Sequence, residues 1–229
     1  MQAAQIDKVK IMGELYLIRH GQASFGTDDY DRLSPLGFEQ AKYLGAYFDA
    51  RDVRFERVIS GTQRRHRETL NGTGFGAEPE LMPGLNEFDF YGLVAAYQRQ
   101  HADEAPIDMT SVREFFLMLR KVLPLWSENK IDNPPEPWEN FQQRIRASLG
   151  SLIEHEVERV LVVCSGGPIS ALLREILQLS VRHMMDINLQ TANTSITRLQ
   201  FKKGKARLQS FNGIPHLDHP DTAHMITLT

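Results

Sequence analysis

The chain has 229 residues, of which 41% are hydrophobic and 24% charged, with a formal net charge of −3. These values are typical of a globular protein of one α/β domain, and they exclude the basic surface that nucleic acids or anionic membranes require, so we expect neither as a partner. The single cysteine, Cys164, excludes an intrachain disulfide framework, and residues 1–13 lack the apolar segment of a secretory signal, so we expect a cytoplasmic protein without a membrane span.

Strands and helices alternate along the first half of the chain. The apolar run Leu15–Ile18 predicts a buried strand over residues 14–19. Ser34-Pro35 then open a helix that continues to Phe48, with serine as the N-cap and proline in the first turn. Residues 57–60 form a short second strand, and residues 62–70 a helix closed by the turn residues 71–74.

The second half begins with a longer, mostly helical segment. Residues 93–155 contain helical patterns at 112–122 and 138–149, separated by the proline-rich break 133–137, and we interpret them as a helical insertion or lid. A buried strand at 160–163 leads into a helix at 169–176, and residues 195–199 and 206–210 alternate as strands. The predicted fold is α/β, a three-layer, mostly parallel sheet flanked by helices, with residues 1–229 as one domain.

The apolar run of the first predicted strand is followed, at a place where α/β sheets collect their ligands, by Arg19, His20, Gly21 and Gln22. The guanidinium of Arg19 offers a planar fork of donors suited to phosphate oxygens. His20 supplies a nitrogen that can attack or carry a proton near neutral pH. Gly21 allows a sharp turn and a close approach of the backbone to an anion.

Three further segments carry candidate chemistry. Arg65 lies near a predicted helix N-terminus, which favours anions, whereas we expect Arg64 and Arg67 to face solvent. Glu87 lies among aromatic residues, where desolvation would raise the pKa of a carboxyl group and suit it to acid catalysis. The nearby Asp89 is expected to be a solvent-facing loop carboxylate. The turn Cys164-Ser165-Gly166-Gly167 has backbone donors that could also cradle an anion.

The order and spacing of these motifs resemble the histidine phosphatase superfamily, which includes the phosphoglycerate mutases. The resemblance covers residues 14–217, and its motifs are Arg-His-Gly after a buried strand, Ser60 with Arg65 and Thr69, Glu87 before an aromatic-glycine loop, residues 193–196, and Asn212 with His216-Leu217. It implies that His20 is a nucleophile that forms a phosphohistidine, that Arg19 and Arg65 clamp the phosphoryl oxygens, and that Glu87 protonates the leaving oxygen and later activates water.

The resemblance further implies phosphate contacts from Gly21, Gln22, Ser165 and Gly166, a small-molecule phosphoester or phosphate as partner, and no metal or other cofactor. The roles are chemically consistent, because neighbouring guanidinium groups disfavour imidazolium and so keep His20 neutral. The same arginines match the charge on the equatorial oxygens of a loose phosphoryl-transfer transition state.

Two positions depart from the family pattern. Ser165 stands where family members usually carry a second histidine, and a hydroxyl donates a hydrogen bond but brings no positive charge. By analogy with the loss of one transition-state donor, the cost is on the order of 10²–10³ in rate. An asparagine common after the first motif is also missing, with Gly26-Thr27 near its place. His66 could substitute for the missing histidine, but we expect it on the helix surface.

Four other functions compete with an active phosphatase. A degenerate site would leave a phospho-ligand binding or regulatory protein. A phosphoglycerate-mutase-type phosphotransferase is disfavoured because the loop over residues 24–34 is acidic at Asp28, Asp29 and Asp31. A cysteine phosphatase on Cys164 would need an arginine where Ser170 stands. An α/β-hydrolase with Ser165 as nucleophile and His183 or His216 as base would need a glycine in place of Val163.

Overall fold

The computed structural model describes residues 12–24, 26, 29–76, 78–104, 107, 111–154 and 157–228. The expected absence of a leader at the N-terminus, and the predictions that involve Thr27, Asp28 and His155, concern residues outside this description. The helices and strands within it are β1 (Gly13–Arg19), α1 (Pro35–Asp49), β2 (Arg57–Ser60), α2 (Arg64–Gly72), β3 (Glu80–Leu81), α3 (Phe90–Gln100), α4 (Val112–Ser127), α5 (Trp138–Glu154), β4 (Arg159–Cys164), α6 (Gly166–Leu177), α7 (Val181–Gln190), β5 (Ile196–Lys202) and β6 (Lys205–Gly213).

The strands form a six-stranded sheet in the order β3-β2-β4-β1-β5-β6. β3, β2, β4 and β1 pair in parallel, and β5 and β6 continue the sheet antiparallel to β1 and to each other. The predicted α/β fold with a mostly parallel sheet is confirmed. Because β1, β2 and β4 are parallel neighbours, the segments that follow Arg19, Ser60 and Cys164 leave the sheet at the same edge.

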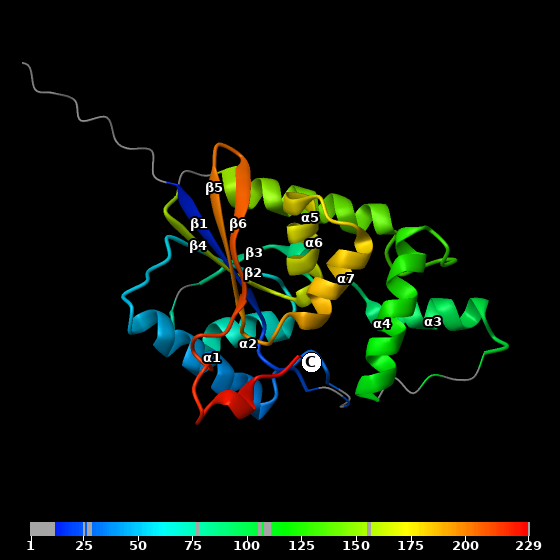
Figure 1. Cartoon of the computed structure of the whole chain (residues 1–229), viewed down its shortest axis with the longest axis horizontal. Coiled ribbons are helices and arrows are strands. Elements are labelled where there is room, and N and C mark those ends of the chain that lie inside the picture. Colours follow the sequence, from blue (N-terminus) through cyan, green and yellow to red (C-terminus); the bar gives the residue numbers. More distant parts are fainter. Residues whose placement is uncertain are drawn as a thin grey trace, which may run out of the picture.

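Each face of the sheet has its own hydrophobic core, so the fold has three layers. Leu15, Leu17 and the alternate residues of the neighbouring strands pack with helices α3 to α7 on one face. Tyr16 and Ile18 point to the other face and pack with α1 and α2. This alternation is the period of two expected for strands buried on both sides. Figure 1 shows α1 and α2 on one side of the strands and α5, α6 and α7 on the other.

The start of α1 follows the predicted capping chemistry. The Oγ atom of Ser34 accepts a hydrogen bond from the backbone N–H of Gly37 at 3.1 Å, and Pro35 occupies the first turn. Helix α2, in contrast, begins at Arg64, two residues later than predicted, because Gln63 remains extended as its N-cap. That extended conformation leaves the Gln63 side chain free to face the site described below.

Three elements were not predicted: β3, α3 and α7. The aromatic-glycine sequence after Asp89 is typical of a loop, yet the Asp89 carboxylate accepts the N–H of Gly92 at 2.8 Å and caps α3. Helix α7 begins in the same way at Ser180, whose Oγ atom accepts the N–H of His183 at 3.2 Å. The first residue of each helix is therefore fixed by a capping residue that the pattern of hydrophobic residues does not reveal.

In the mostly helical segment after α2, helices α3 and α4 lie at the far end of the molecule from β6, whereas α5 runs back toward β5 and β6 (Figure 1). Its aromatic core joins α4 to α5, where the rings of Trp126 and Phe141 lie 5.3 Å apart and those of Trp126 and Trp138 lie 4.9 Å apart. The interpretation of residues 93–155 as an insertion on a single domain stays a prediction. Helix α4 forms part of the wall of the cavity described in the next section, which is the position that a lid would require.

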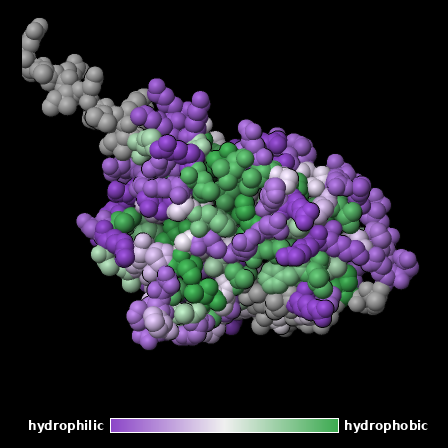
Figure 2. All heavy atoms as spheres, viewed as in Figure 1, coloured by the Kyte–Doolittle hydropathy of each residue, from purple (hydrophilic) through white to green (hydrophobic). Residues whose placement is uncertain are grey.

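In Figure 2, hydrophobic side chains gather near the middle of the face shown, over α6 and beside β6, within a mostly hydrophilic surround. Among the described residues, no helix combines the length and apolar character needed to cross a bilayer.

Candidate active site

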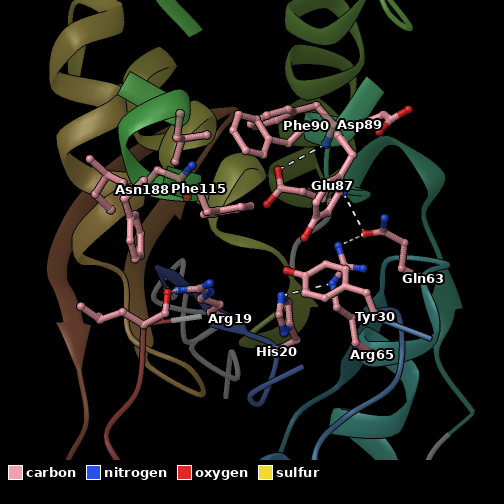
Figure 3. Close-up of a pocket in the computed structure, with 16 residues that line it drawn as sticks. Arg19, His20, Tyr30, Gln63, Arg65, Glu87, Asp89, Phe90, Phe115 and Asn188 are labelled. Atoms are coloured by element: carbon pink, nitrogen blue, oxygen red, sulfur yellow. Dashed lines mark hydrogen bonds between the residues drawn. The ribbon is translucent and has the colours of Figure 1, made fainter. Parts of the chain in front are cut away.

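A cavity of about 290 Å³ opens beyond the edge of the sheet where β1, β2 and β4 end. Arg19, His20, Arg65 and Glu87 all line it, although they come from four separate parts of the chain. Figure 3 shows His20 and Arg65 on one side of the cavity and Glu87 opposite them, with Arg19 beside His20. The central prediction from the sequence was that one imidazole and two guanidinium groups converge on a common oxyanion; the three side chains do line one cavity, and Glu87 joins them there.

His20 is held in one orientation and one tautomer. Its Nδ1 atom lies 2.7 Å from the carbonyl oxygen of Gly21, and because a carbonyl only accepts, Nδ1 carries the proton. The Nε2 atom therefore has a lone pair, and the Nε–H of Arg65 donates to it at 3.2 Å. Burial, followed by the charges of Arg65 and Arg19, lowers the pKa of His20 well below its usual value. The imidazole is neutral at physiological pH, as a nucleophile must be.

Arg65 is buried and fixed by several acceptors around its guanidinium group. One Nη atom donates to the Asp31 carboxylate at 2.6 Å, and the other donates to the side-chain amide oxygen (Oε1) of Gln63 at 2.9 Å. The Oγ atom of Ser165 lies 3.4 Å from the same Nη atom as Gln63. This network holds the guanidinium plane beside His20, so an anion entering the cavity meets a donor fork that is already oriented.

Arg19 is fixed by backbone carbonyls from two distant segments. Its Nη1 atom donates to the carbonyl oxygen of Thr191, and to that of Leu228 at 3.0 Å. The Nε–H of Arg19 is buried and has no hydrogen-bond partner in the structure. Burial and the charge of Arg65 lower the pKa of Arg19, but a guanidinium remains charged in proteins. Arg19 therefore adds a fixed positive charge and a free donor at the cavity wall.

Glu87 provides the only carboxyl group among the described residues that both lines the cavity and faces the His20 side of it (Figure 3). Its two oxygens accept the N–H of Gly167 at 3.1 Å and the N–H of Phe88 at 3.2 Å. Burial raises the pKa of Glu87, an effect that the Gly167 N–H and the two arginines reduce. A raised pKa favours the protonated carboxyl group, which is the form that a general acid needs.

The approach of Glu87 depends on a glycine in the turn before α6. A Cβ atom on Gly167 would lie 1.9 Å from Oε1 of Glu87, so no larger residue fits there without displacing the carboxyl group. The predicted anion cradle in this turn therefore serves, at Gly167, to hold the carboxyl group of Glu87.

The predicted phosphate ligands Gly21 and Gln22 do not line the cavity. The N–H of Gly21 donates to Thr69 at 2.9 Å, and the N–H of Gln22 donates to Gln40 at 2.8 Å. Ser165 and Gly166 are buried behind the cavity wall, where Ser165 reaches the site only through its contact with Arg65. Direct contact of these four residues with phosphate stays a prediction.

The expected place of His66 on the helix surface is wrong. The side chain is fully buried under the first turn of α2, and its Nε2 atom lies 2.7 Å from the Oγ atom of Ser165. Its ring centroid is 5.7 Å from that of His20. The charged neighbours Arg64 and Arg67 are exposed, as expected. Because His66 lies in a run of polar residues in α2, the sequence gives no sign that its side chain points into the protein.

Sequence reasoning also missed Gln63, Tyr30 and Leu228, which line the cavity. The side-chain amide oxygen of Gln63 accepts a hydrogen bond from the backbone N–H of Glu87 at 2.9 Å and another from the Arg65 guanidinium, so it links these two residues. An amide at the N-cap of α2 was the only signal for this role. Asp89, as expected, is an exposed carboxylate; it borders the cavity, but its side chain points away from Glu87 and His20 (Figure 3).

The nucleophiles of two competing functions are unsuited to catalysis. The Cys164 thiol is fully buried, and burial raises its pKa far above the usual value, so a thiolate is disfavoured. Ser165 pairs with His66, whereas His183 pairs with Ser180 and His216 pairs with Thr194. The hydrolase triad considered from the sequence is therefore not assembled.

The family model of the histidine phosphatase superfamily (branch 1) matches residues 15–213, which contain all four cavity-lining candidates. The chain belongs to this superfamily. A curated protein of Hydrogenobacter thermophilus, named "Putative phosphoserine phosphatase 2", is 26% identical over 220 residues, or 90% of this chain and 98% of that protein. The expected enzyme class, a phosphatase, is supported by the family and by this relative's name.

Solved structures support the fold. A mutant phosphoserine phosphatase from Entamoeba histolytica, in complex with phosphoserine, superposes with a TM-score of 0.62 at 20% identity, covering 90% of this chain and 100% of that one. A phosphoglycerate mutase from Bacillus anthracis gives a TM-score of 0.62 at 22% identity, covering 90% of this chain and 95% of that one. The shared architecture thus hosts both phosphatases and mutases.

Proposed function

We propose that the protein is a metal-independent phosphomonoesterase that acts through a phosphohistidine on His20. The observation that carries this proposal is the state of the imidazole, whose Nδ1–H is given to the Gly21 carbonyl while Nε2 keeps a lone pair beside Arg65 at the cavity wall. A nitrogen in this state needs no deprotonation before it attacks phosphorus, once the incoming phosphoryl group displaces the Arg65 Nε–H from its lone pair.

In the first half-reaction, Nε2 of His20 forms a bond to phosphorus while the bond from phosphorus to the ester oxygen breaks. Arg19 and Arg65 stabilise the charge on the equatorial oxygens. Glu87 gives its proton to the leaving oxygen, so the alcohol departs neutral and Glu87 becomes a carboxylate.

In the second half-reaction, the Glu87 carboxylate takes a proton from water as the oxygen attacks the phosphohistidine. The bond between phosphorus and Nε2 breaks, inorganic phosphate leaves, and His20 and Glu87 return to their starting protonation states. Each step uses groups that line the same cavity.

The substrate class we propose is a small-molecule phosphoester, because the cavity is a small enclosure of about 290 Å³. The structural relatives solved with phosphoserine and with 3-phosphoglyceric acid bind ligands of this kind. Ser165 in place of a second histidine supports a rate below that of family members with both histidines. A binding or regulatory protein that retained only the anion pocket is the alternative that the same serine favours.

The test is turnover of 4-nitrophenyl phosphate by the purified protein between about pH 5 and pH 8. We expect hydrolysis that His20→Ala abolishes. Absence of turnover, together with saturable phosphate binding that Arg65→Ala removes, would establish the binding protein instead. Interconversion of 3- and 2-phosphoglycerate as fast as ester hydrolysis would establish a mutase.

A further inference from the structure

The part of the cavity that faces away from His20 is apolar. Phe90 and Phe115 pack edge to face there, with their ring centroids 4.7 Å apart. Tyr91 packs on Tyr30 at 5.9 Å, and Tyr30 itself lies at the His20 end, where the Arg65 guanidinium is 5.4 Å from its ring centroid (Figure 3). Helix α4 supplies much of this wall, and the C-terminal segment closes the other side. The apolar and aromatic lining residues are Tyr30, Phe88, Phe90, Tyr91, Phe115, Phe116, Leu119, Leu189 and Leu228.

The charges at the cavity are unequally distributed. Among the described lining residues, Arg19 and Arg65 are the cations, and both lie at the His20 end. The neutral polar groups are His20, Gln63, Asn188 and the hydroxyls of Tyr30 and Tyr91, and the remaining charges are the carboxyl groups of Glu87 and Asp89. A second anionic group on a substrate would be desolvated against this wall and would find no cationic partner there. Its desolvation would therefore raise the free energy of the bound state.

We propose that the site selects phosphomonoesters whose alcohol is apolar or aromatic over those whose alcohol bears a carboxylate. This inference rests on the proposed phosphatase function. The phosphoryl group binds to the two arginines. The alcohol part of the ester lies against the aromatic wall, where burial of its apolar surface contributes to binding. Phosphoserine and 3-phosphoglycerate, which structural relatives bind, are then poor substrates for this chain.

The experiment compares linear alkyl phosphates from ethyl to hexyl phosphate, which have nearly the same leaving group. We expect kcat/KM to rise with each added methylene by up to about fourfold, the value for its full burial. Phosphoserine and 3-phosphoglycerate should be hydrolysed no faster than ethyl phosphate. Phosphocholine and its neutral carbon isostere, 3,3-dimethylbutyl phosphate, separate an apolar site from an aromatic site that selects cations.

Phe116 provides the matched variant, because it lines the cavity, whereas the next residue in α4, Leu117, is exposed and does not. Phe116→Ala should lower the ratio of kcat/KM for hexyl over ethyl phosphate by about tenfold, from the apolar contact it removes. Leu117→Ala should leave that ratio unchanged.

Three results would overturn this inference while leaving the phosphatase function intact: a flat alkyl series, a preference for phosphoserine, or a preference for phosphocholine over its neutral isostere. Failure of the phosphatase function gives a different pattern, since no ester would then be hydrolysed in a manner that depends on His20.

A second inference rests on the buried pair of His66 and Ser165. Nε2 of His66 lies 2.7 Å from the Ser165 Oγ atom, and Nδ1 of His66 is buried with no hydrogen-bond partner. Nδ1 faces the backbone of Gly61, where an added Cβ atom would lie only 2.2 Å away, so Gly61 makes room for the ring. A proton on Nδ1 would be an unpaired buried donor against a Cα–H group, whereas a lone pair there is tolerated. The proton therefore resides on Nε2.

With that tautomer, the Ser165 Oγ atom accepts from Nε2–H of His66 and from Arg65, and its own proton is left without an acceptor among these groups. We propose that His66 is a positioning residue that holds the Ser165 Oγ atom as an acceptor for the Arg65 guanidinium, which in turn contacts the phosphoryl group. The pair then fixes Arg65 from behind the cavity wall, without the second positive charge that a histidine at position 165 would bring.

A double-mutant cycle tests this role, with kcat and KM measured on one good alkyl phosphate substrate and folding checked by thermal unfolding. We expect Ser165→Ala and His66→Ala each to lower kcat by about tenfold to hundredfold with little change in KM, and the double variant to be no worse than either. His66→Gln, whose amide N–H can replace Nε2–H, should stay within about threefold of wild type. Additive losses, or equal losses in His66→Gln and His66→Ala, would overturn the proposal.

Discussion

Replacement of Glu87 by glutamine isolates the proton that the leaving group needs. The amide has the same shape as the carboxyl group, and its oxygen can still accept the Gly167 N–H, which lies 3.1 Å from Oε2 of Glu87. The amide nitrogen takes the place of Oε1 and gives up the longer hydrogen bond from the Phe88 N–H at 3.2 Å. The variant therefore keeps the cavity geometry and the arginine clamp but has no acidic proton. Its effect on the rate should depend on how strongly the leaving oxygen requires protonation.

For an alkyl phosphate, whose alkoxide is a poor leaving group, we expect kcat to fall by about 10²–10⁴, the usual contribution of a general acid. This range corresponds to about 2.7–5.4 kcal/mol in activation free energy. For 4-nitrophenyl phosphate, whose phenolate leaves without a proton, the first half-reaction should be much less affected. The ratio of the two losses measures the role of Glu87 as an acid.

The assay is steady-state turnover of both substrates across a pH range, complemented by single-turnover measurements that isolate the first half-reaction. Because burial raises the pKa of Glu87, the wild-type protein should lose kcat for alkyl phosphates as pH rises through that raised pKa. The glutamine variant should lose this alkaline limb. Equal losses of the two substrates in the first half-reaction, or an unchanged alkaline limb, would refute the reasoning.

Three further predictions follow from single contacts. Arg65→Lys, which cannot reproduce the planar fork that contacts His20 and Asp31, should lower kcat/KM for every phosphoester by about 10²–10³ in steady-state assays. Gly167→Ala should displace Glu87 and reproduce the substrate-dependent loss of its glutamine variant, whereas Gly150→Ala, with no atom within 4 Å of the added methyl, should leave kinetics unchanged. His216→Gln should make the free energy of unfolding less sensitive to acid. Burial lowers the pKa of His216 from 6.5 to about 4, so on acidification the unfolded chain binds the proton first. The wild-type protein should therefore lose about 3 kcal/mol of stability as pH falls from 6.5 to about 4. Urea unfolding near pH 7 and pH 4 measures this difference, and an unchanged pH dependence in the variant would contradict it.

The sequence was sufficient to place the cavity residues that lie at strand ends. Buried strands such as Leu15–Ile18 are recognisable from unbroken apolar runs, and in a parallel sheet their carboxyl ends share one edge. Arg19, His20 and Arg65 each follow such a strand or begin the next helix, so their convergence could be expected. Glu87 was identifiable from its aromatic neighbours and from the resemblance.

The missed features depend on side-chain direction, which residue order does not give. His66 lies next to Arg65 in a run of polar residues, and its burial requires the space above Gly61 and a hydroxyl at position 165. Gln63 acts through a carbonyl oxygen shared between Arg65 and Glu87, a contact that needs an extended N-cap. Leu228 reaches the cavity from more than two hundred residues away along the chain from Arg19.

The most direct test of the account is to trap the covalent intermediate. The protein is mixed with an alkyl or nitrophenyl phosphoester, quenched in base during turnover, and digested for mass spectrometry under conditions that preserve phosphohistidine. We predict a phosphoryl group on Nε2 of His20 that is lost in acid and does not form in His20→Ala. Hydrolysis without that adduct under single-turnover conditions, or with the phosphoryl group on another residue, would contradict the proposed mechanism.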